Sequence, residues 1–336
     1  MFSPIFPKEC GWSLGGQWVL VWFSRYRERS VFLGVILMKI NLVNRRNFSR
    51  KNLIGYLFNS PFIIFTLVMW IYPFLWGILI SFKKWNLISP RQTWVWFDNY
   101  LTAIKDPLLW LMVKNSIYFM VVFITITTVT SLGLALLVKQ IPKKYAGFYI
   151  TGFLLSYVCS GVAYSMVFNL LFAGDGLVNN ILKTIGIRVG WFTNPKIAMA
   201  SIALIVCWKF TGYYGLFFLA GLNNINQTIY EAALIDGANA WQRFIKITVP
   251  LLNATFVMII VFATITSFGL FTEPYMITNG GPMNSTRTMM LEIYHRVFGL
   301  LQAGYGSSLA IVSAIITFAF VWAFRKLIER DDVYDA

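Results

Sequence analysis

The stretch that decides the fold class is VKNSIYFMVVFITITTVTSLGLALLV, residues 113–138, in which Lys114 is the one charged side chain. A helix needs about 20 apolar residues to cross the hydrocarbon core of a bilayer. Stretches of that length occur six times, at residues 56–82, 113–138, 148–172, 197–221, 250–272 and 305–325. The sequence therefore predicts an all-α polytopic membrane protein with about six transmembrane helices.

The composition supports this class. Of the 336 residues, 58% are hydrophobic and 12% are charged, whereas a soluble domain carries roughly twice that charged fraction. The formal net charge is +15, but membrane proteins use Lys and Arg in their loops to fix orientation. Since no basic stretch lies on a soluble domain, no nucleic-acid partner is expected.

Residues that carry enzymatic chemistry are scarce. The chain has a single histidine, His295, and three cysteines, Cys10, Cys159 and Cys207, that lie far apart in the sequence. This spacing indicates neither a metal site nor a disulfide framework. No Gly-Lys dipeptide occurs, so a phosphate-binding loop of the Walker type is not expected. We expect no catalytic residue and no cofactor, and any ATP would be hydrolysed by another chain.

The distribution of Lys and Arg predicts the orientation. Residues 38–55, 139–147, 222–249 and 326–336 together hold 12 Lys and Arg residues. The three intervening loops are longer in total and hold 9; they are residues 83–112, 173–196 and 273–304. The denser set faces the cytoplasm in membrane proteins. Both termini are therefore predicted to be cytoplasmic, with 38–55 a basic segment and 326–336 a tail.

The first 37 residues do not fit a spanning helix. An apolar run near residues 18–23 is too short to cross a bilayer and is followed by Arg25, Arg27 and Arg29. It also lacks the order of a signal peptide. Residues 1–37 are interpreted as a dispensable extension before Met38, and an amphipathic surface segment is the alternative.

Residues 228–250, TIYEAALIDGANAWQRFIKITVP, predict two short helices outside the membrane. Thr228 and Glu231 have the spacing of a capping box that starts the first helix, and Asn239 and Gln242 repeat it for the second. Gly237 permits a turn between them.

The second short helix has an apolar face formed by Trp241, Phe244 and Ile245. Pro250 marks the start of the next spanning helix. The apolar faces need a cover, which is either the ends of the spanning helices or another protein.

The same stretch resembles the EAA loop of permease subunits in binding-protein-dependent ABC importers. The family pattern has Glu-Ala-Ala, three residues, Gly, nine residues, Ile, one residue and Leu-Pro. This sequence matches it at Glu231, Ala232, Ala233, Gly237, Ile247 and Pro250, and Asp236 and Ala238 match the common Asp-Gly-Ala core. It departs at Val249, where the family has Leu.

The resemblance extends over residues 50–325. Leu219-Ala220-Gly221-Leu222 is similar to a family motif, and Thr278-Asn279-Gly280-Gly281-Pro282 with Thr286 resembles a segment of the carbohydrate-uptake branch, the maltose and glycerol-phosphate type. The third stretch lacks prolines that are common in relatives.

The resemblance implies a permease subunit that binds ABC ATPase subunits through a cytoplasmic coupling loop at residues 228–250. The implied coupling residues are Glu231, Ala232, Ala233, Asp236, Gly237, Trp241, Phe244, Ile247 and Pro250. Further implied partners are a second permease, an extracytoplasmic solute-binding protein and a sugar substrate. ATP and Mg would be bound by the ATPase, in a bacterial plasma membrane.

Several polar and aromatic residues in the apolar stretches are candidates for the substrate path. They are Tyr118, Asn169, Lys209, Tyr214, Phe262, Thr266 and Ser267. Packing is the alternative role for such side chains. Lys209 lies in the middle of the fourth stretch, where a charge is costly, so it either serves function or pairs within the bundle.

A rival interpretation is a secondary transporter or channel that is not coupled to an ATPase. Such proteins usually place coupling carboxylates inside the membrane. Acidic residues are scarce in the six stretches, and Glu273 lies just beyond the fifth. The importer permease is therefore favoured.

Overall fold

The computed structural model describes residues 50–328 of the chain. The predicted extension, residues 1–37, lies outside the described residues, as do 38–49 and 329–336 of the predicted flanking segments. The described residues belong to two units, one that ends at Ile71 and one that begins at Tyr72.

The described residues form helices and one small antiparallel sheet. The α-helices are α3 (Arg50–Thr66), α4 (Tyr72–Ser81), α5 (Asp98–Lys105), α6 (Pro107–Gln140), α7 (Lys143–Val158), α8 (Gly161–Leu171), α9 (Leu177–Lys183), α10 (Ala198–Asn224), α11 (Gln227–Ile235), α12 (Ala240–Arg243), α13 (Val249–Leu251), α14 (Asn253–Phe268), α15 (Met289–Tyr294) and α16 (Ala303–Ile328). Short π-helical segments are η1 (Leu67–Ile71), η2 (Phe244–Thr248), η3 (Pro274–Thr278) and η4 (His295–Gly299). Strand β1 (Lys83–Lys84) pairs with β2 (Thr93–Trp94), with Lys83 opposite Trp94.

Four of the predicted spans are confirmed as helices that are long and apolar enough to cross a membrane. They are Tyr56–Ser81, Pro107–Gln140, Ala198–Asn224 and Ala303–Ile328. Two bent helix pairs would raise the number of spans among the described residues to six if each pair is one span.

The third predicted span, residues 148–172, is not one straight helix. It consists of α7 and α8, which are bent by 92° at a short break. Cys159 and Ser160 have ψ angles of 136° and 132°. Two successive residues in extended conformation interrupt the helical hydrogen bonds, so the direction of the chain changes there.

The fifth span does not begin at Pro250 as predicted. Pro250 lies in the short helix α13, and a 63° bend separates the segment that ends at Leu251 from α14, which starts at Asn253. Proline lacks a backbone N–H, and its place in the first turn of α13 requires none. Helix α14 ends at Phe268, before the predicted boundary at residue 272.

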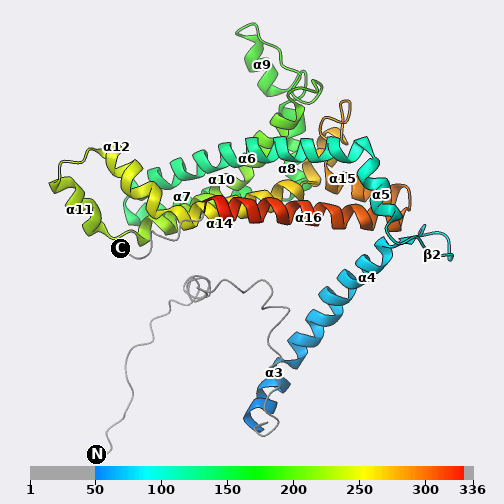
Figure 1. The fold of residues 1–336 in the computed structure, drawn as a ribbon. Coiled ribbons are helices and arrows are strands. Elements are labelled where there is room, and N and C mark those ends of the chain that lie inside the picture. Colours follow the sequence, from blue (N-terminus) through cyan, green and yellow to red (C-terminus); the bar gives the residue numbers. More distant parts are fainter. Residues whose placement is uncertain (1–49, 329–336) are drawn as a thin grey trace, which may run out of the picture. The chain divides into compact units, whose positions relative to one another are not determined.

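Within residues 72–336, α10 is the central helix. It packs on α6, α7 and α14, while α16 packs on α4, α5, α14 and α15 (Figure 1). Large fully buried side chains fill the contacts around α10: Phe119, Phe123, Ile202, Ile205, Tyr214, Phe218, Leu222 and Ile259.

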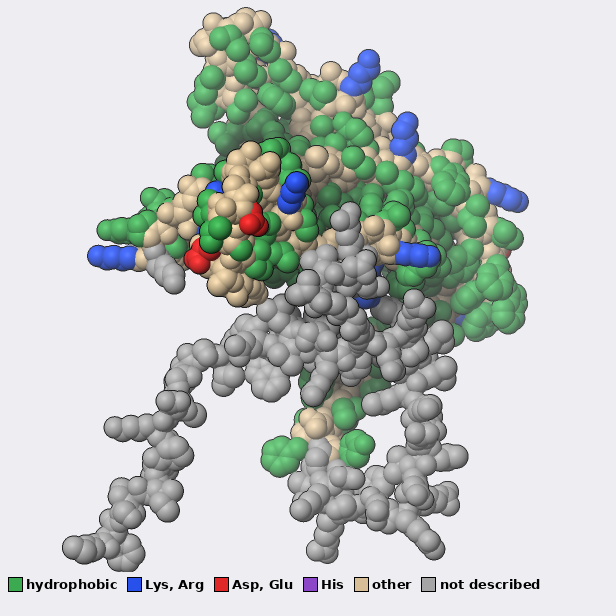
Figure 2. Space-filling model, turned by 60° about the vertical axis from the view of Figure 1, so that its left-hand side comes forward, with side chains coloured by type: hydrophobic (Ala, Val, Ile, Leu, Met, Phe, Trp, Pro, Cys, Tyr) green, Lys and Arg blue, Asp and Glu red, His purple; other side chains and the backbone are tan. Residues whose placement is uncertain are grey.

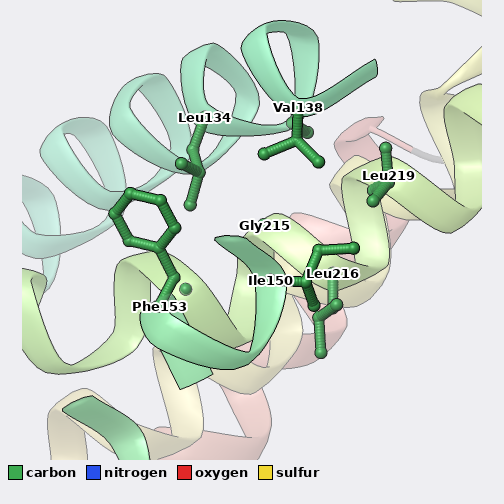
Figure 3. A pocket seen from close by; sticks show the side chains of 9 residues that line it. Leu134, Val138, Ile150, Phe153, Gly215, Leu216 and Leu219 are labelled. Atoms are coloured by element: carbon green, nitrogen blue, oxygen red, sulfur yellow. The ribbon is translucent and has the colours of Figure 1, made fainter. Parts of the chain in front are cut away.

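Glycine lets α7 approach α10 closely. A Cβ on Gly212 would lie 2.3 Å from the backbone oxygen of Phe153, so a larger residue would push the helices apart. Figure 3 shows apolar side chains of α6, α7 and α10, among them Leu134, Ile150 and Leu219, converging beside this contact. The hole that they leave measures about 10 Å³, which is the size of one water and far too small for a sugar.

Many large hydrophobic side chains are exposed. Hydrophobic side chains are spread over much of the described face in Figure 2, and charged side chains are sparse there. In the first unit, Phe58 is 84% and Trp70 is 71% exposed. Surface of this kind requires lipid or protein as its neighbour, as expected for a membrane protein.

Candidate functional site

The first helix of the 228–250 loop, α11, starts two residues earlier than the predicted capping box implies. Its N-cap is Asn226, whose side-chain oxygen accepts a hydrogen bond of 3.1 Å from the backbone N–H of Thr228. The predicted capping box of Thr228 and Glu231 is therefore wrong. Asparagine is one of the strongest N-cap residues. Since Asn226 caps the helix, Thr228 lies inside its first turn.

Gly237 ends α11 in a Schellman motif. The N–H of Ala238 donates to the carbonyl of Ala233 at 2.9 Å, and the N–H of Gly237 donates to Leu234 at 3.1 Å. Gly237 has φ +78°, a left-handed conformation that glycine adopts without steric cost. The predicted turn at Gly237 is confirmed.

The capping box of the second helix is also confirmed. The side chain of Asn239 accepts from the N–H of Gln242 at 2.8 Å, and the side chain of Gln242 accepts from the N–H of Asn239 at 2.9 Å. Helix α12 then continues into η2 and α13. This arrangement directs the chain back toward the bundle.

The inner side of the loop is tied to the ends of α6 and α10. The hydroxyls of Tyr230 and Thr248 are 2.9 Å apart and share a hydrogen bond. The ammonium of Lys139 donates to the carbonyl of Leu222 at 3.0 Å and lies 5.4 Å from the centre of the Tyr230 ring. These contacts fix α11 and η2 relative to the spans.

The outer side of the loop presents an exposed apolar surface. Ile235 is 88%, Trp241 is 67% and Leu234 is 53% exposed. Of the predicted coupling residues, those with exposed side chains or backbone are Glu231, Ala232, Asp236, Gly237 and Trp241; those that are partly buried are Ala233, Phe244, Ile247 and Pro250. Packing on the bundle thus covers one side of the loop and leaves the other available.

Three predicted substrate-path residues lie together between α10 and α14. The side chain of the buried Tyr214 lies near that of Thr266, whose hydroxyl donates to the carbonyl of Phe262 at 2.9 Å. Phe262 is 44% exposed and stacks on Phe217 at 6.4 Å. Ser267 lies on the same helix but is fully buried, and its hydroxyl donates to the carbonyl of Ala263.

The other predicted path residues lie apart from this group. Tyr118 is on α6 and Asn169 is on α8. The ammonium of Lys209 lies 4.7 Å from the centre of the Tyr164 ring. The hydroxyl of Tyr164 donates to the carboxyl of Glu273, and burial raises the pKa of that carboxyl. Lys209 therefore has an aromatic neighbour within the bundle.

Sequence reasoning missed an aromatic cluster that links α7, α10 and α14. Tyr157 stacks on Tyr213 at 4.2 Å, Tyr157 also contacts Phe210 at 5.4 Å, and Tyr213 contacts Phe217 at 5.1 Å. Phe210, Tyr213 and Phe217 recur at helical spacing along α10, so this signal was present in the sequence. Together with Phe262, which stacks on Phe217, they form a continuous aromatic cluster.

At the opposite end of α6 and α16 from the loop, beside α15 in Figure 1, a buried ion cluster was also missed. Glu292 is 1% exposed and forms ion pairs of 2.6 Å with both Arg287 and Arg296. Arg296 lies 3.8 Å from Asp106, the N-cap of α6. The cluster joins α15 and η4 to the start of α6.

The Gly-Gly-Pro segment next to this cluster is a closed loop. The hydroxyls of Thr278 and Thr286 are 2.6 Å apart, and Thr286 donates to the carbonyl of Gly281 at 2.7 Å. The side chain of Asn115 on α6 donates to the carbonyls of Asn284 and Arg287. These bonds attach the segment to the bundle.

Comparison with known proteins places these features in a family. Residues 30–330 match the family described as binding-protein-dependent transport system inner membrane component. The lactose transport system permease protein LacF of Rhizobium radiobacter is 35% identical over 285 residues, which are 81% of this chain and 94% of LacF. The sulfoquinovosyl glycerol transport system permease protein SmoG of Agrobacterium fabrum is 32% identical and covers 83% of this chain and 92% of its own length.

The fold is shared with a solved structure. A chain of a bacterial ABC transporter involved in the import of the acidic polysaccharide alginate superimposes with a TM-score of 0.73 at 22% identity, over 84% of this chain and 97% of that chain. The family match covers most of the sequence, and the transporter fold agrees with it. The chain is therefore a multi-pass membrane protein that belongs to the inner membrane components of binding-protein-dependent transport systems.

Proposed function

We propose that this chain is one of two permease subunits of an ATP-driven importer that moves a sugar or oligosaccharide across the bacterial plasma membrane. The observation that carries the proposal is the 228–250 loop. It is anchored on one side and exposes Glu231, Trp241 and a glycine-hinged turn on the other. A separate ATPase subunit would bind this exposed side.

The geometry supports a mechanical role for the loop. Tyr230 and Lys139 connect α11 to α6 and α10, so a push on the outer face would reach the spanning helices. Rigid-body movement of packed helices about an interface is a common route for such switching. ATP and Mg would be bound by the ATPase, and this chain would do no covalent chemistry. Both chain termini and the loop would be cytoplasmic.

Relatives and side-chain chemistry support a carbohydrate cargo, which an external solute-binding protein would deliver. LacF is named for lactose and SmoG for sulfoquinovosyl glycerol. The ring faces of Tyr157, Tyr213 and Phe262, with the hydroxyl of Thr266 and the amide of Asn169, would form the path together with Tyr118, Lys209, Tyr214 and Ser267. The alternative, a secondary transporter or channel without an ATPase, is disfavoured by the family to which the chain belongs.

Co-purification tests the coupling role. An affinity-tagged wild-type chain, expressed with its neighbouring transporter genes, should bring down an ATPase subunit. Glu231→Ala should weaken this association because it removes the exposed carboxylate of α11, and Gly237→Pro should abolish it because proline cannot adopt φ +78°.

A matched control is Asp175→Asn, which removes an exposed acid whose side chain is 83% accessible and lies outside the loop. This variant should retain the ATPase. Retention of the ATPase by both loop variants, with membrane insertion unchanged, would contradict the proposal.

A further inference from the structure

A cavity of about 380 Å³, widely open to the surface, lies between the ends of α6 and α10 and the inner side of the 228–250 loop. Its volume is within the range of small-molecule binding sites. The polar residues of its lining include Lys139, Gln140, Gln227, Tyr230, Arg243 and Thr248. It therefore offers a polar site at a place where two spans meet the loop.

The cavity has a positive charge that nothing in its lining balances. Lys139 and Arg243 are cationic, and no acidic residue is among the described residues that line the cavity. The acids of the loop, Glu231 and Asp236, are exposed instead. A cationic cavity of this kind favours an anionic occupant.

Arg243 provides a second observation that points to a ligand. Its Nε atom is buried and has no hydrogen-bond partner among the described residues. A buried donor that lacks a partner is costly. Among the described residues Arg243 also forms no salt bridge, so its guanidinium charge has no anionic partner in this part of the chain and would attract an anion in the cavity. The ammonium of Lys139 has three protons and gives one hydrogen bond to the carbonyl of Leu222, so it can also donate to an oxygen of that anion.

The position of the cavity indicates where the anion comes from. Lys139 and Gln140 are the last two residues of α6, and Leu222 lies in the last turn of α10. Both helices are candidate spans, so the cavity lies at the level where spans leave the hydrocarbon. Leu136, Leu222 and Phe244 add an apolar wall, which suits the start of an acyl chain and which a soluble anion would not need.

We propose that this cavity binds the phosphate head group of an anionic phospholipid from the membrane leaflet on the side of the loop. Basic pockets between transmembrane helices are a known setting for such head groups. The bound phosphate would join Lys139 of α6 to Arg243 of α12. The lipid would thereby brace the loop against the spans, independently of any ATPase contact.

Native mass spectrometry of the purified, delipidated transporter complex tests the proposal. Phosphatidylglycerol is added as the probe, and phosphatidylcholine with the same acyl chains is the reference. The wild type should retain phosphatidylglycerol in preference to phosphatidylcholine. Lys139→Gln and Arg243→Gln should each weaken its binding about fivefold, since each removes a charge that attracts anionic lipid.

Two variants sharpen the result. Lys246→Gln removes an exposed cation of the same loop that does not line the cavity, and it should bind like the wild type. Arg243→Lys keeps the charge but loses the Nε donor, and it should bind with an intermediate affinity. A thermal melt of each variant without lipid verifies folding.

Two outcomes would overturn the proposal. One is unchanged phosphatidylglycerol binding by a folded double variant, Lys139→Gln with Arg243→Gln. The other is displacement of the lipid from the wild type by inorganic phosphate at equal concentration, which would mean that the cavity recognises a soluble anion.

Discussion

At Gly237 a single backbone angle determines the shape of the exposed loop. The φ of +78° and the two hydrogen bonds of the Schellman motif turn the chain between α11 and α12, which are separated by residues 236–239. No heavy atom of residues 50–328 lies within 4 Å of a Cβ built at this position. The requirement for glycine is therefore conformational rather than a matter of space.

Gly237→Ala is expected to destabilise this turn by about 1–2 kcal/mol, the cost of the left-handed conformation for a residue with a Cβ. Hydrogen exchange at the Ala238 amide should quicken about 5- to 30-fold. Gly237→Asn should have a smaller effect because asparagine tolerates this region. Equal exchange in the alanine variant and the wild type would show that the turn is not held in this conformation.

At Glu292 a buried carboxylate forms ion pairs with two arginines. Glu292→Gln should lower the free energy of unfolding by about 3–5 kcal/mol, because Arg287 and Arg296 would lose a partner that is itself buried. Thermal unfolding in detergent measures this. Asp175→Asn breaks exposed pairs with Lys183 and Arg188 and should cost at most about 1 kcal/mol. A similar loss for both variants would contradict the importance of the buried cluster.

Among the elements, α7 and α8 show how a broken span is held in place. Helix α7 packs on α10 at Gly212, and α8 contacts the segment after α14 through Tyr164 and Glu273. The two halves of the third span thus have separate partners. The 92° bend between them follows from this division.

A pair of glycine substitutions tests the contact between α7 and α10. Gly212→Ala places a Cβ 2.3 Å from the oxygen of Phe153 and should destabilise the fold by about 1–3 kcal/mol through overpacking. Gly152 lies within α7, and in the described part of the chain no heavy atom lies within 4 Å of a Cβ built there. Gly152→Ala should stabilise the fold by about 0.5–1 kcal/mol, since alanine favours a helix. Thermal melts should therefore shift in opposite directions, and a shift in the same direction would argue against this packing.

At the scale of the whole molecule, loops 139–147 and 228–250 are predicted to face one side of the membrane, and loop 173–196 is predicted to face the other. In a variant whose native cysteines are replaced by serine, Asp175→Cys should react with a membrane-impermeant maleimide in cells whose outer barrier has been opened. Lys144→Cys, in the predicted cytoplasmic loop 139–147 and outside the proposed ATPase-binding surface, should react only after the plasma membrane is permeabilised. Both positions are exposed, so access to the reagent is determined by sidedness. The reverse pattern would invert the proposed orientation.

The amino-acid sequence by itself determined the membrane class, four spans within a few residues, the turn at Gly237 and the cap at Asn239. These depend on local chemistry: apolar length, backbone freedom and short-range hydrogen bonds. The N-cap of α11 also depends on local chemistry. Asn226 and Thr228 are both suitable capping residues, and the spacing of Thr228 and Glu231 predicted Thr228, whereas the structure has Asn226.

Only the tertiary structure decided the breaks near residues 159–160 and 252, the aromatic cluster around Tyr213, the ion cluster around Glu292 and the cavity beside Arg243. The aromatic cluster and the cavity depend on contacts between helices that are distant in the sequence. The ion cluster connects two arginines near Glu292 in the sequence with the distant Asp106. Hydropathy measures how apolar a segment is. It carries no information about which helix the segment packs against. The sequence of the 228–250 loop therefore predicts two helices but not which side of them is anchored. The structure shows the anchored side through the contacts of Tyr230 with Thr248 and Lys139.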